Sequence, residues 1–189
     1  MNRSSKTILA LAAALACGLG GYFAVQRFRT PAPEELRGWR TRQLAGLTLE
    51  APGDFHGTPL DLGAAAEFVE SSEMQVFKTT DFEIDVLRTI YKSGIELNFN
   101  GAAKGAVDGI ARLDGIRNVE HTASEQTVSG KPARRLEITA ERFRKPVCVE
   151  ALLISDGPAY YQVQAIFDPT NPNAPSIAQR LLKSVQLAP

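Results

Sequence analysis

The sequence predicts an α+β fold, in which an antiparallel β-sheet carries helices on its faces and is preceded by one N-terminal transmembrane or signal helix. Three features indicate it: four strand-like runs forming a meander from Val119 to Asp168, one amphipathic helix before them, and an uncharged N-terminal stretch. The 189 residues divide into a membrane segment at 1–29, a linker at 30–43 and a single domain at 44–189.

Residues 1–29 are expected to enter a membrane. Arg3 and Lys6 precede 19 uncharged residues, a run long enough to cross hydrocarbon as a helix. Cleaved signal peptides usually have an apolar region of about 7–15 residues, so the length favours a retained anchor. Two alternatives stay open: cleavage after Ala14-Leu15-Ala16 would give a secreted domain, and acylation at Cys17 would give a lipoprotein. The Ala-Leu-Ala-Cys-Gly run resembles a lipoprotein signal whose Leu is displaced by one position.

The charges on either side of this segment support two opposite orientations in the membrane. Five arginines from Arg27 to Arg42 follow it and only Arg3, Lys6 and the N-terminus precede it, although positive charge favours the cytoplasmic side. A short basic N-terminus directly followed by an apolar run is, however, the layout of an export signal. We therefore expect a protein of the bacterial inner membrane with its domain in the periplasm.

The linker at 30–43 is predicted from its prolines, its charges and its lack of apolar periodicity. Trp39, near its end, is expected to pack against the domain. Four of the 21 basic residues and none of the 21 acidic residues lie before Thr30, which leaves 17 basic and 21 acidic residues. A domain of negative net charge lacks the cationic surface that phosphate backbones require, so no nucleic-acid partner is expected.

The first half of the domain reads as strands followed by a helix. A first strand at Leu47–Ala51 ends at a Pro-Gly-Asp turn, and residues 61–69 have no clear pattern. Gln75–Thr80 and Phe82–Tyr91 are predicted to pair as a hairpin. Apolar residues at helical spacing predict a helix over Asn98–Leu113, which a glycine at 115 ends.

The second half reads as the meander and a short closing helix. The turns are expected at Ser129–Pro132, Arg144–Pro146 and Asp156–Pro158. The second strand has one apolar face, formed by Leu136, Ile138 and Ala140. Val147–Ile154 and Tyr160–Phe167 are apolar on both faces, which is typical of central strands covered on both sides. Cys148 is expected to be a small buried hydrophobe, and the helix carries Ile177, Leu181 and Val185.

The candidate metal-binding and acid/base residues are explained by structural roles. His56 and His121 have no second ligand at metal-binding spacing, so no metal is expected. Asp81, Glu83 and Asp85 share one face of a strand, and we expect a solvated outer face there because the pattern of a calcium loop is missing.

Glycines and basic residues are interpreted in the same way. Ser129-Gly130 lacks the frame of a nucleophile elbow, and Gly101, Gly105 and Gly109 favour close packing of a helix on a sheet over a second membrane contact. The basic residues of the meander are expected to form cross-strand ion pairs with Glu137, Glu141 and Glu150 in preference to holding an anionic ligand. They are Arg134, Arg135, Arg142, Arg144 and Lys145. We therefore expect no catalytic, cofactor-binding or metal-binding residues, and no enzyme activity.

Four motifs and the order of elements resemble one known superfamily. The motifs are Leu47–Phe55 (LTLEAPGDF), Leu113–Val119 (LDGIRNV), Val128–Ala133 (VSGKPA) and Leu182–Leu187 (LKSVQL). They resemble the PsbP-like/DcrB-like α/β/α sandwich from about Leu44 to the end of the last motif. The resemblance implies a non-enzymatic binding or assembly module of the bacterial envelope.

The expected function is a membrane-tethered envelope module that binds a protein partner or aids assembly of a complex. The alternatives are a small-ligand carrier or an enzyme whose cleft is invisible in the linear sequence, and an envelope protein of stress or phage response without a soluble ligand.

Overall fold

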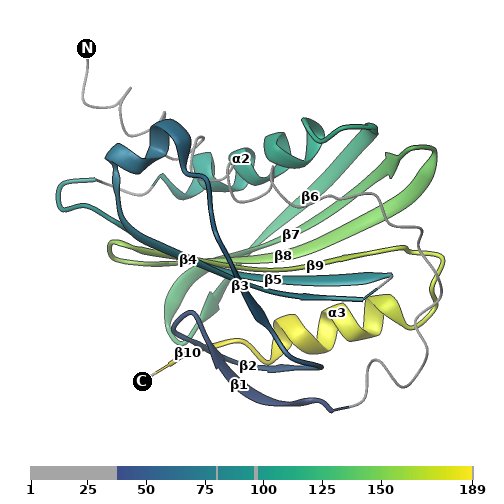
Figure 1. The fold of residues 1–189 in the computed structure, drawn as a ribbon, viewed down its shortest axis with the longest axis horizontal. Coiled ribbons are helices and arrows are strands. Elements are labelled where there is room, and N and C mark those ends of the chain that lie inside the picture. Colours follow the sequence, from purple (N-terminus) through teal and green to yellow (C-terminus); the bar gives the residue numbers. More distant parts are fainter. Residues whose placement is uncertain (1–37, 80, 96–97, 189) are drawn as a thin grey trace.

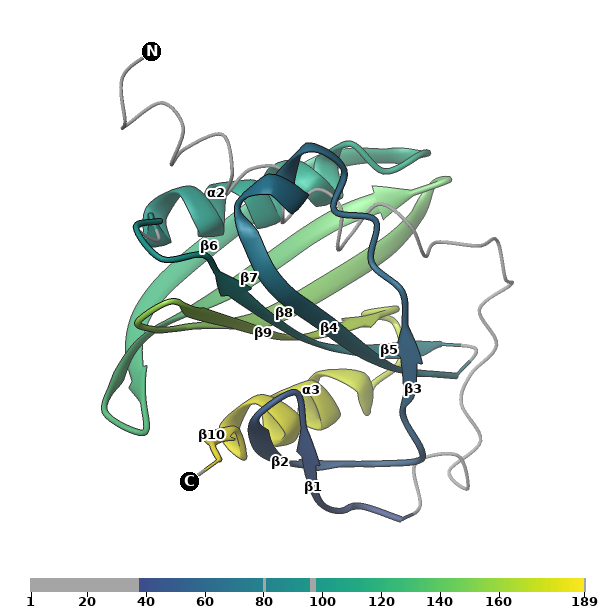
Figure 2. The ribbon, with the colours of Figure 1, turned by 60° about the vertical axis from the view of Figure 1, so that its left-hand side comes forward.

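The computed structural model describes residues 38–79, 81–95 and 98–188, so the predicted membrane segment and most of the linker lie outside it. A large twisted sheet runs through the middle of the molecule, with a helix above it and a helix and a small sheet below it (Figures 1 and 2). Within the described ranges, no helix is both long and apolar enough to span a bilayer.

The large sheet has seven strands, each antiparallel to its neighbours. In spatial order they are β3 (His56–Thr58), β4 (Val69–Lys78), β5 (Phe82–Tyr91), β9 (Ala159–Phe167), β8 (Lys145–Asp156), β7 (Lys131–Arg142) and β6 (Ile116–Val128). The four strands β6 to β9 follow one another in sequence and in space, which confirms the predicted meander. The predicted central strands β8 and β9 lie inside the sheet, and β9 is buried along its whole length.

The two faces of this sheet carry different layers. Helix α2 (Phe99–Ala111) covers one face together with a 3₁₀ helix at Gly63–Glu67, in the region that has no clear sequence pattern. Helix α3 (Ala174–Lys183) covers the other face. Beside α3 lies a three-stranded sheet of β1 (Arg40–Leu44), β2 (Leu47–Ala51) and β10 (Gln186–Leu187), in the order β1-β2-β10. The predicted α+β fold with a helix on each face is confirmed.

Local signals fix the ends of α2. The side chain of Asn98 accepts a hydrogen bond from the Gly101 N–H at 3.0 Å, which caps the first turn. Gly105 and Gly109 are buried along the helix, as expected for glycines that let a helix approach a sheet closely. The helix ends at Ala111, two residues before the predicted end.

Two predicted boundaries were wrong. β1 begins at Arg40, inside the predicted linker, and pairs with β2 along its whole length. The sequence pattern does not reveal this strand, because β1 lies at the edge of its sheet and most of its residues are polar. Trp39 packs on the core below the large sheet, as predicted, and its ring lies 4.3 Å from the Arg180 guanidinium carbon. The second meander turn is the pair Phe143-Arg144, whereas Lys145 and the following proline belong to β8.

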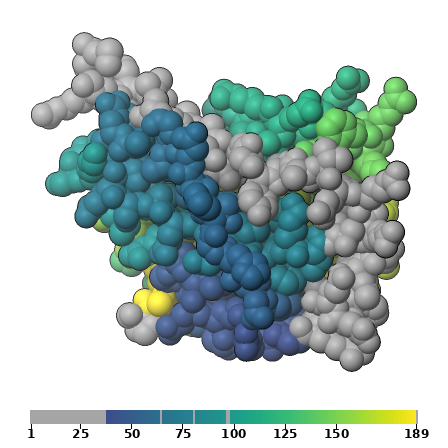
Figure 3. Space-filling view, in the orientation of Figure 1, coloured from purple at the N-terminus to yellow at the C-terminus, as the bar shows by residue number. Residues whose placement is uncertain are grey.

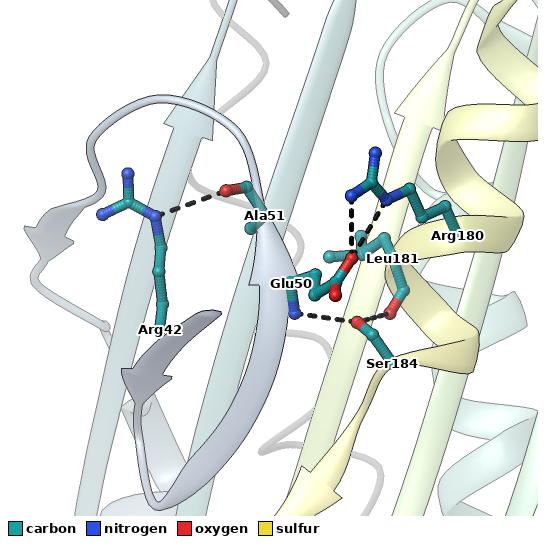
Figure 4. A network of polar contacts seen from close by, with 6 residues as sticks. All are labelled: Arg42, Glu50, Ala51, Arg180, Leu181 and Ser184. Carbon is teal, nitrogen blue, oxygen red and sulfur yellow. Dashed lines mark hydrogen bonds and ion pairs between the residues drawn. The ribbon is translucent and has the colours of Figure 1, made fainter. Parts of the chain in front are cut away.

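A polar network joins the small sheet to α3 (Figure 4). The Ser184 hydroxyl accepts a hydrogen bond from the Glu50 N–H at 2.8 Å and donates one to the Leu181 carbonyl at 2.7 Å. The Arg180 guanidinium donates twice to Glu50 Oε2, at 3.0 and 2.9 Å. These contacts link β2 to the last turn of α3, 130 positions further along the chain.

Candidate functional site

A row of polar side chains is buried on the face of the sheet that α2 covers. Glu83 and Asp85 on β5 are each only 6% exposed, and Asp81, just before the strand, is only 3% exposed, so the predicted solvated outer face was wrong. β5 lies between β4 and β9 inside a sheet with a second layer on both sides, so neither of its faces reaches solvent. Gln162 and Gln164, the buried polar residues of β9, lie beside them.

Hydrogen bonds connect this polar row into a chain. The Tyr160 hydroxyl donates to Gln162 Oε1 at 2.8 Å, and Gln162 Nε2 donates to Gln164 Oε1 at 2.8 Å. Gln164 Nε2 then donates to Asp85 Oδ2 at 2.6 Å. The second oxygen of Asp85, Oδ1, is buried and has no hydrogen-bond partner among the described residues. Ionising a buried carboxyl group is costly when one of its oxygens has no hydrogen-bond donor. These surroundings therefore favour the neutral form of Asp85.

The electrostatics of the row follow from this burial. Burial, and next the neighbouring Glu83 carboxylate, raise the pKa of Asp85 to about 7, against the weaker opposing effect of the Gln164 hydrogen bond. Burial also raises the pKa of Glu83, although Lys78 Nζ lies 2.6 Å from Glu83 Oε2 and opposes the shift. The row can therefore hold a proton near neutral pH. No group of three metal-ligating side chains occurs within the described ranges.

The second feature is an exposed corner where the end of α2 meets the turn between β7 and β8. We call it the hairpin corner and define it by Gly115, Arg117, Phe143 and Arg144. A pocket of about 770 Å³ opens there, and its lining is Asp114, Gly115, Ile116, Arg117, Asn118, Glu141, Phe143 and Arg144. The light green tip of the β7–β8 hairpin projects beside the end of α2 (Figure 3).

Phe143 is held in an unusual position at this corner. It is 55% exposed, and it is the one large hydrophobic side chain in the described part of the chain that is exposed to this degree. Both turn residues have positive φ, 49° at Phe143 and 67° at Arg144, which costs a side-chain-bearing residue about 1–2 kcal/mol. The Phe143 N–H donates to the Gly115 carbonyl at 3.0 Å. A Cβ at Gly115 would lie 2.4 Å from the Phe143 ring, so only glycine lets the ring rest there.

The other candidate residues have the surroundings that the sequence predicts. Arg135 pairs across strands with Glu150, as predicted, and also with Glu137 on its own strand. Arg134 also pairs across strands, but with Glu125 of β6, at 2.9 Å, and not with one of the predicted glutamates. His56 and His121 are exposed residues of β3 and β6, the two edge strands. Cys148 is half-buried at the edge of the core, and burial raises the pKa of its thiol.

The hairpin corner could not be found from the sequence. Arg117 and Arg144 are far apart along the chain, and only the pairing of β6 with β7 brings them to one pocket. Gly115 has the positive φ expected of a glycine that ends a helix, but that pattern does not reveal the ring that rests on it. The buried row had one available signal, the glutamines of an otherwise apolar strand.

Together, these features define an α+β sandwich whose seven-stranded sheet is covered on both faces. No family model matches the chain, and no curated protein matches it. Among solved structures it is similar to PsbP (CyanoP) from the cyanobacterium Synechocystis, with a TM-score of 0.57 and 13% identity over 84% of this chain and 98% of that one. The predicted PsbP-like fold is confirmed.

Two further solved structures have lower scores. One is LpqN of Mycobacterium tuberculosis, a protein involved in cell envelope biogenesis, with a TM-score of 0.48 and 16% identity over 76% of this chain and 83% of that one. The other is PA94, a protein of unknown function from Pseudomonas aeruginosa, with a TM-score of 0.39 and 14% identity over 75% of this chain and 92% of that one.

Proposed function

We propose that the protein is a non-enzymatic envelope module, tethered to the bacterial inner membrane by residues 1–29, that binds a protein partner in the periplasm. The uncharged leader with its preceding basic residues supports the tether. The observation that carries the binding role is the hairpin corner, where an aromatic ring is exposed on a turn of positive φ beside a pocket. Side-chain-bearing residues in the left-handed region are enriched at functional sites, which supports a binding role for this turn.

The chemistry of the corner indicates the kind of partner surface. A ring held on a rigid turn loses little conformational entropy on binding, and exposed aromatic and arginine side chains are enriched at the centres of protein interfaces. The Arg142 guanidinium carbon lies 5.6 Å from the Phe143 ring centroid, and Arg117 and Arg144 line the same pocket. Because Asp114 and Glu141 also line this pocket, its charges are mixed, and we expect a partner with an apolar socket for the ring and polar groups of both signs around it.

Site-specific photo-crosslinking in intact cells tests this role. A photoreactive residue replacing Phe143 is expected to give one defined protein adduct, and the same residue at Lys183, exposed at the end of α3 on the other face, is expected to give none. With the isolated partner, Phe143→Ser should weaken binding about thirtyfold, the loss of about 2 kcal/mol typical of an interface hot spot, and Lys183→Ser should not. Adducts with lipid alone, or identical adducts at both positions, would overturn the proposal.

A second candidate is a small-ligand carrier, or an enzyme with a cleft site. The observation that favours it is Asp85 Oδ1, a buried acceptor without a donor among the described residues. A ligand with an N–H or O–H group would satisfy that oxygen, provided that the layer above β5 opens. A ligand that binds there would raise the stability of the native protein, whereas a purely structural carboxyl group predicts no ligand that does so.

A further inference from the structure

Strand β6 is an edge of the large sheet, and no other strand of the described residues pairs with its outer side. It is 13 residues long and ends the strand order, whereas β3 at the opposite edge has only three residues. Every residue from 120 to 127 is exposed, and neither lysine nor proline occurs between 118 and 127. Proteins usually blunt such an edge with charge, proline, a bulge or a cover, because its free N–H and C=O groups accept another strand. Here the exposed stretch carries two charged residues, Glu120 and Glu125, and an irregularity lies only near the start of β6, between Arg117 and Glu120.

The geometry of the β6–β7 turn determines which backbone N–H and C=O groups of β6 point away from the sheet. Ser129 and Gly130 form a two-residue turn with φ of 50° and 77°, so the flanking pair Val128 and Lys131 closes the hairpin as a hydrogen-bonded pair. Such pairs alternate along antiparallel strands, so the even-numbered residues of β6 from 120 to 128 bond to β7. The odd-numbered ones, among them Ala123, direct their N–H and C=O groups away from the sheet.

We propose that β6 pairs antiparallel with β6 of a second copy about a two-fold axis at Ala123. This register sets His121 of each copy opposite Glu125 of the other, so that an imidazole N–H can donate to a carboxylate on both sides of the axis. Glu125 is already oriented by Arg134 at 2.9 Å. The small Ala123 meets its own copy at the axis, and Thr122 meets Ser124.

Self-complementarity selects this register over its neighbours. Centring the axis at Glu120 or at Glu125 would set identical carboxylates directly opposite each other, which destabilises a strand pair. Centring at residue 122 or 124 leaves both His121 and Glu125 opposite uncharged residues. With the axis at Ala123 the two sheets become one continuous sheet, and the long exposed edge disappears.

The test measures the mass of the full-length protein in detergent by size exclusion with light scattering over a dilution series. We expect a dimer that dissociates on dilution. Ala123→Pro removes an outward N–H that β7 does not use, so the variant should fold and be monomeric throughout. His121→Glu should raise the dimer dissociation constant about tenfold, because two like-charged pairs replace two complementary ones. Adding Glu125→His to it exchanges the partners and should restore the dimer.

The exposed position of His121 makes His121→Glu informative even if the proline variant fails to fold. A wild-type protein that is monomeric at all concentrations would overturn the proposal. So would a dimer that is unchanged by His121→Glu, which would place its interface elsewhere, for example in the membrane segment.

Discussion

Asp85→Asn is expected to stabilise the domain at pH 8 by about 2–4 kcal/mol and to change its stability little at pH 4. The amide is the same shape as the carboxyl group, can still bond to Gln164, and never ionises. The native protein must instead ionise a buried carboxyl group whose pKa is raised to about 7 by burial and by the Glu83 carboxylate. About three pH units separate this pKa from the ordinary value of 3.8, and each unit corresponds to about 1.4 kcal/mol.

The direction of the pH dependence follows from proton linkage. Between about pH 4 and pH 7 the folded protein keeps a proton on Asp85 that the unfolded chain has lost, so stability falls as the pH rises. Below pH 4 both states are protonated and the full stability is present. Above pH 7 both are ionised and the penalty is constant. Glu83, whose pKa is also raised by burial, adds a fall in the same direction that the variant retains.

Urea unfolding of residues 38–189 between pH 4 and pH 8 measures this effect. The control is Asp54→Asn, whose carboxyl group is largely exposed and should change stability by less than about 1 kcal/mol at any pH. A loss of stability in Asp85→Asn at pH 8 would contradict the expectation. It would show that the native carboxylate has a cationic or hydrogen-bonding partner within the protein.

Leu152→Ala and Leu153→Ala are each expected to cost about 2–5 kcal/mol of unfolding free energy. These neighbours on β8 are both fully buried, but Leu152 belongs to the cluster between the sheet and α3, and Leu153 to the cluster between the sheet and α2. Because a strand alternates its side chains, only a sheet covered on both faces makes both changes equally severe.

Chemical denaturation of the two variants tests the three-layer architecture. Val119→Ala, at a half-buried position of the β6 edge, is the control and should cost no more than about 1.5 kcal/mol. If one of the two leucine variants were as stable as this control, one face of β8 would lack its cover, and the fold described above would be contradicted.

Periodicity predicts much of this fold, because alternation and helical spacing report which residues face a core. It places Phe82, Ile84 and Val86 correctly on one apolar face. It fails on the other face of the same strand, since alternation cannot distinguish a wet face from a polar row beneath a second layer. Asp85 is therefore read as solvent-exposed although its hydrogen bond to Gln164 joins strands 79 positions apart in sequence.

The rest of the candidate site depends on tertiary contacts that leave no trace in a linear pattern. Pro146 suggests a turn, yet it belongs to β8, opposite Glu141, and the turn falls on Phe143 and Arg144 at positive φ. A two-residue hairpin turn of this type requires positive φ at both positions, but propensity does not favour phenylalanine and arginine there, so the sequence does not reveal this turn.

The proposed role depends above all on the tether, because residues 1–29 fix both the compartment and the surface that a partner can reach. The intact mass of the protein extracted from the membrane fraction tests it most directly. We predict that the protein is found in the membrane fraction and has its full-length mass. Loss of the first sixteen residues with added acyl chains would instead indicate a lipoprotein, and a full-length protein found in the soluble fraction would contradict membrane tethering.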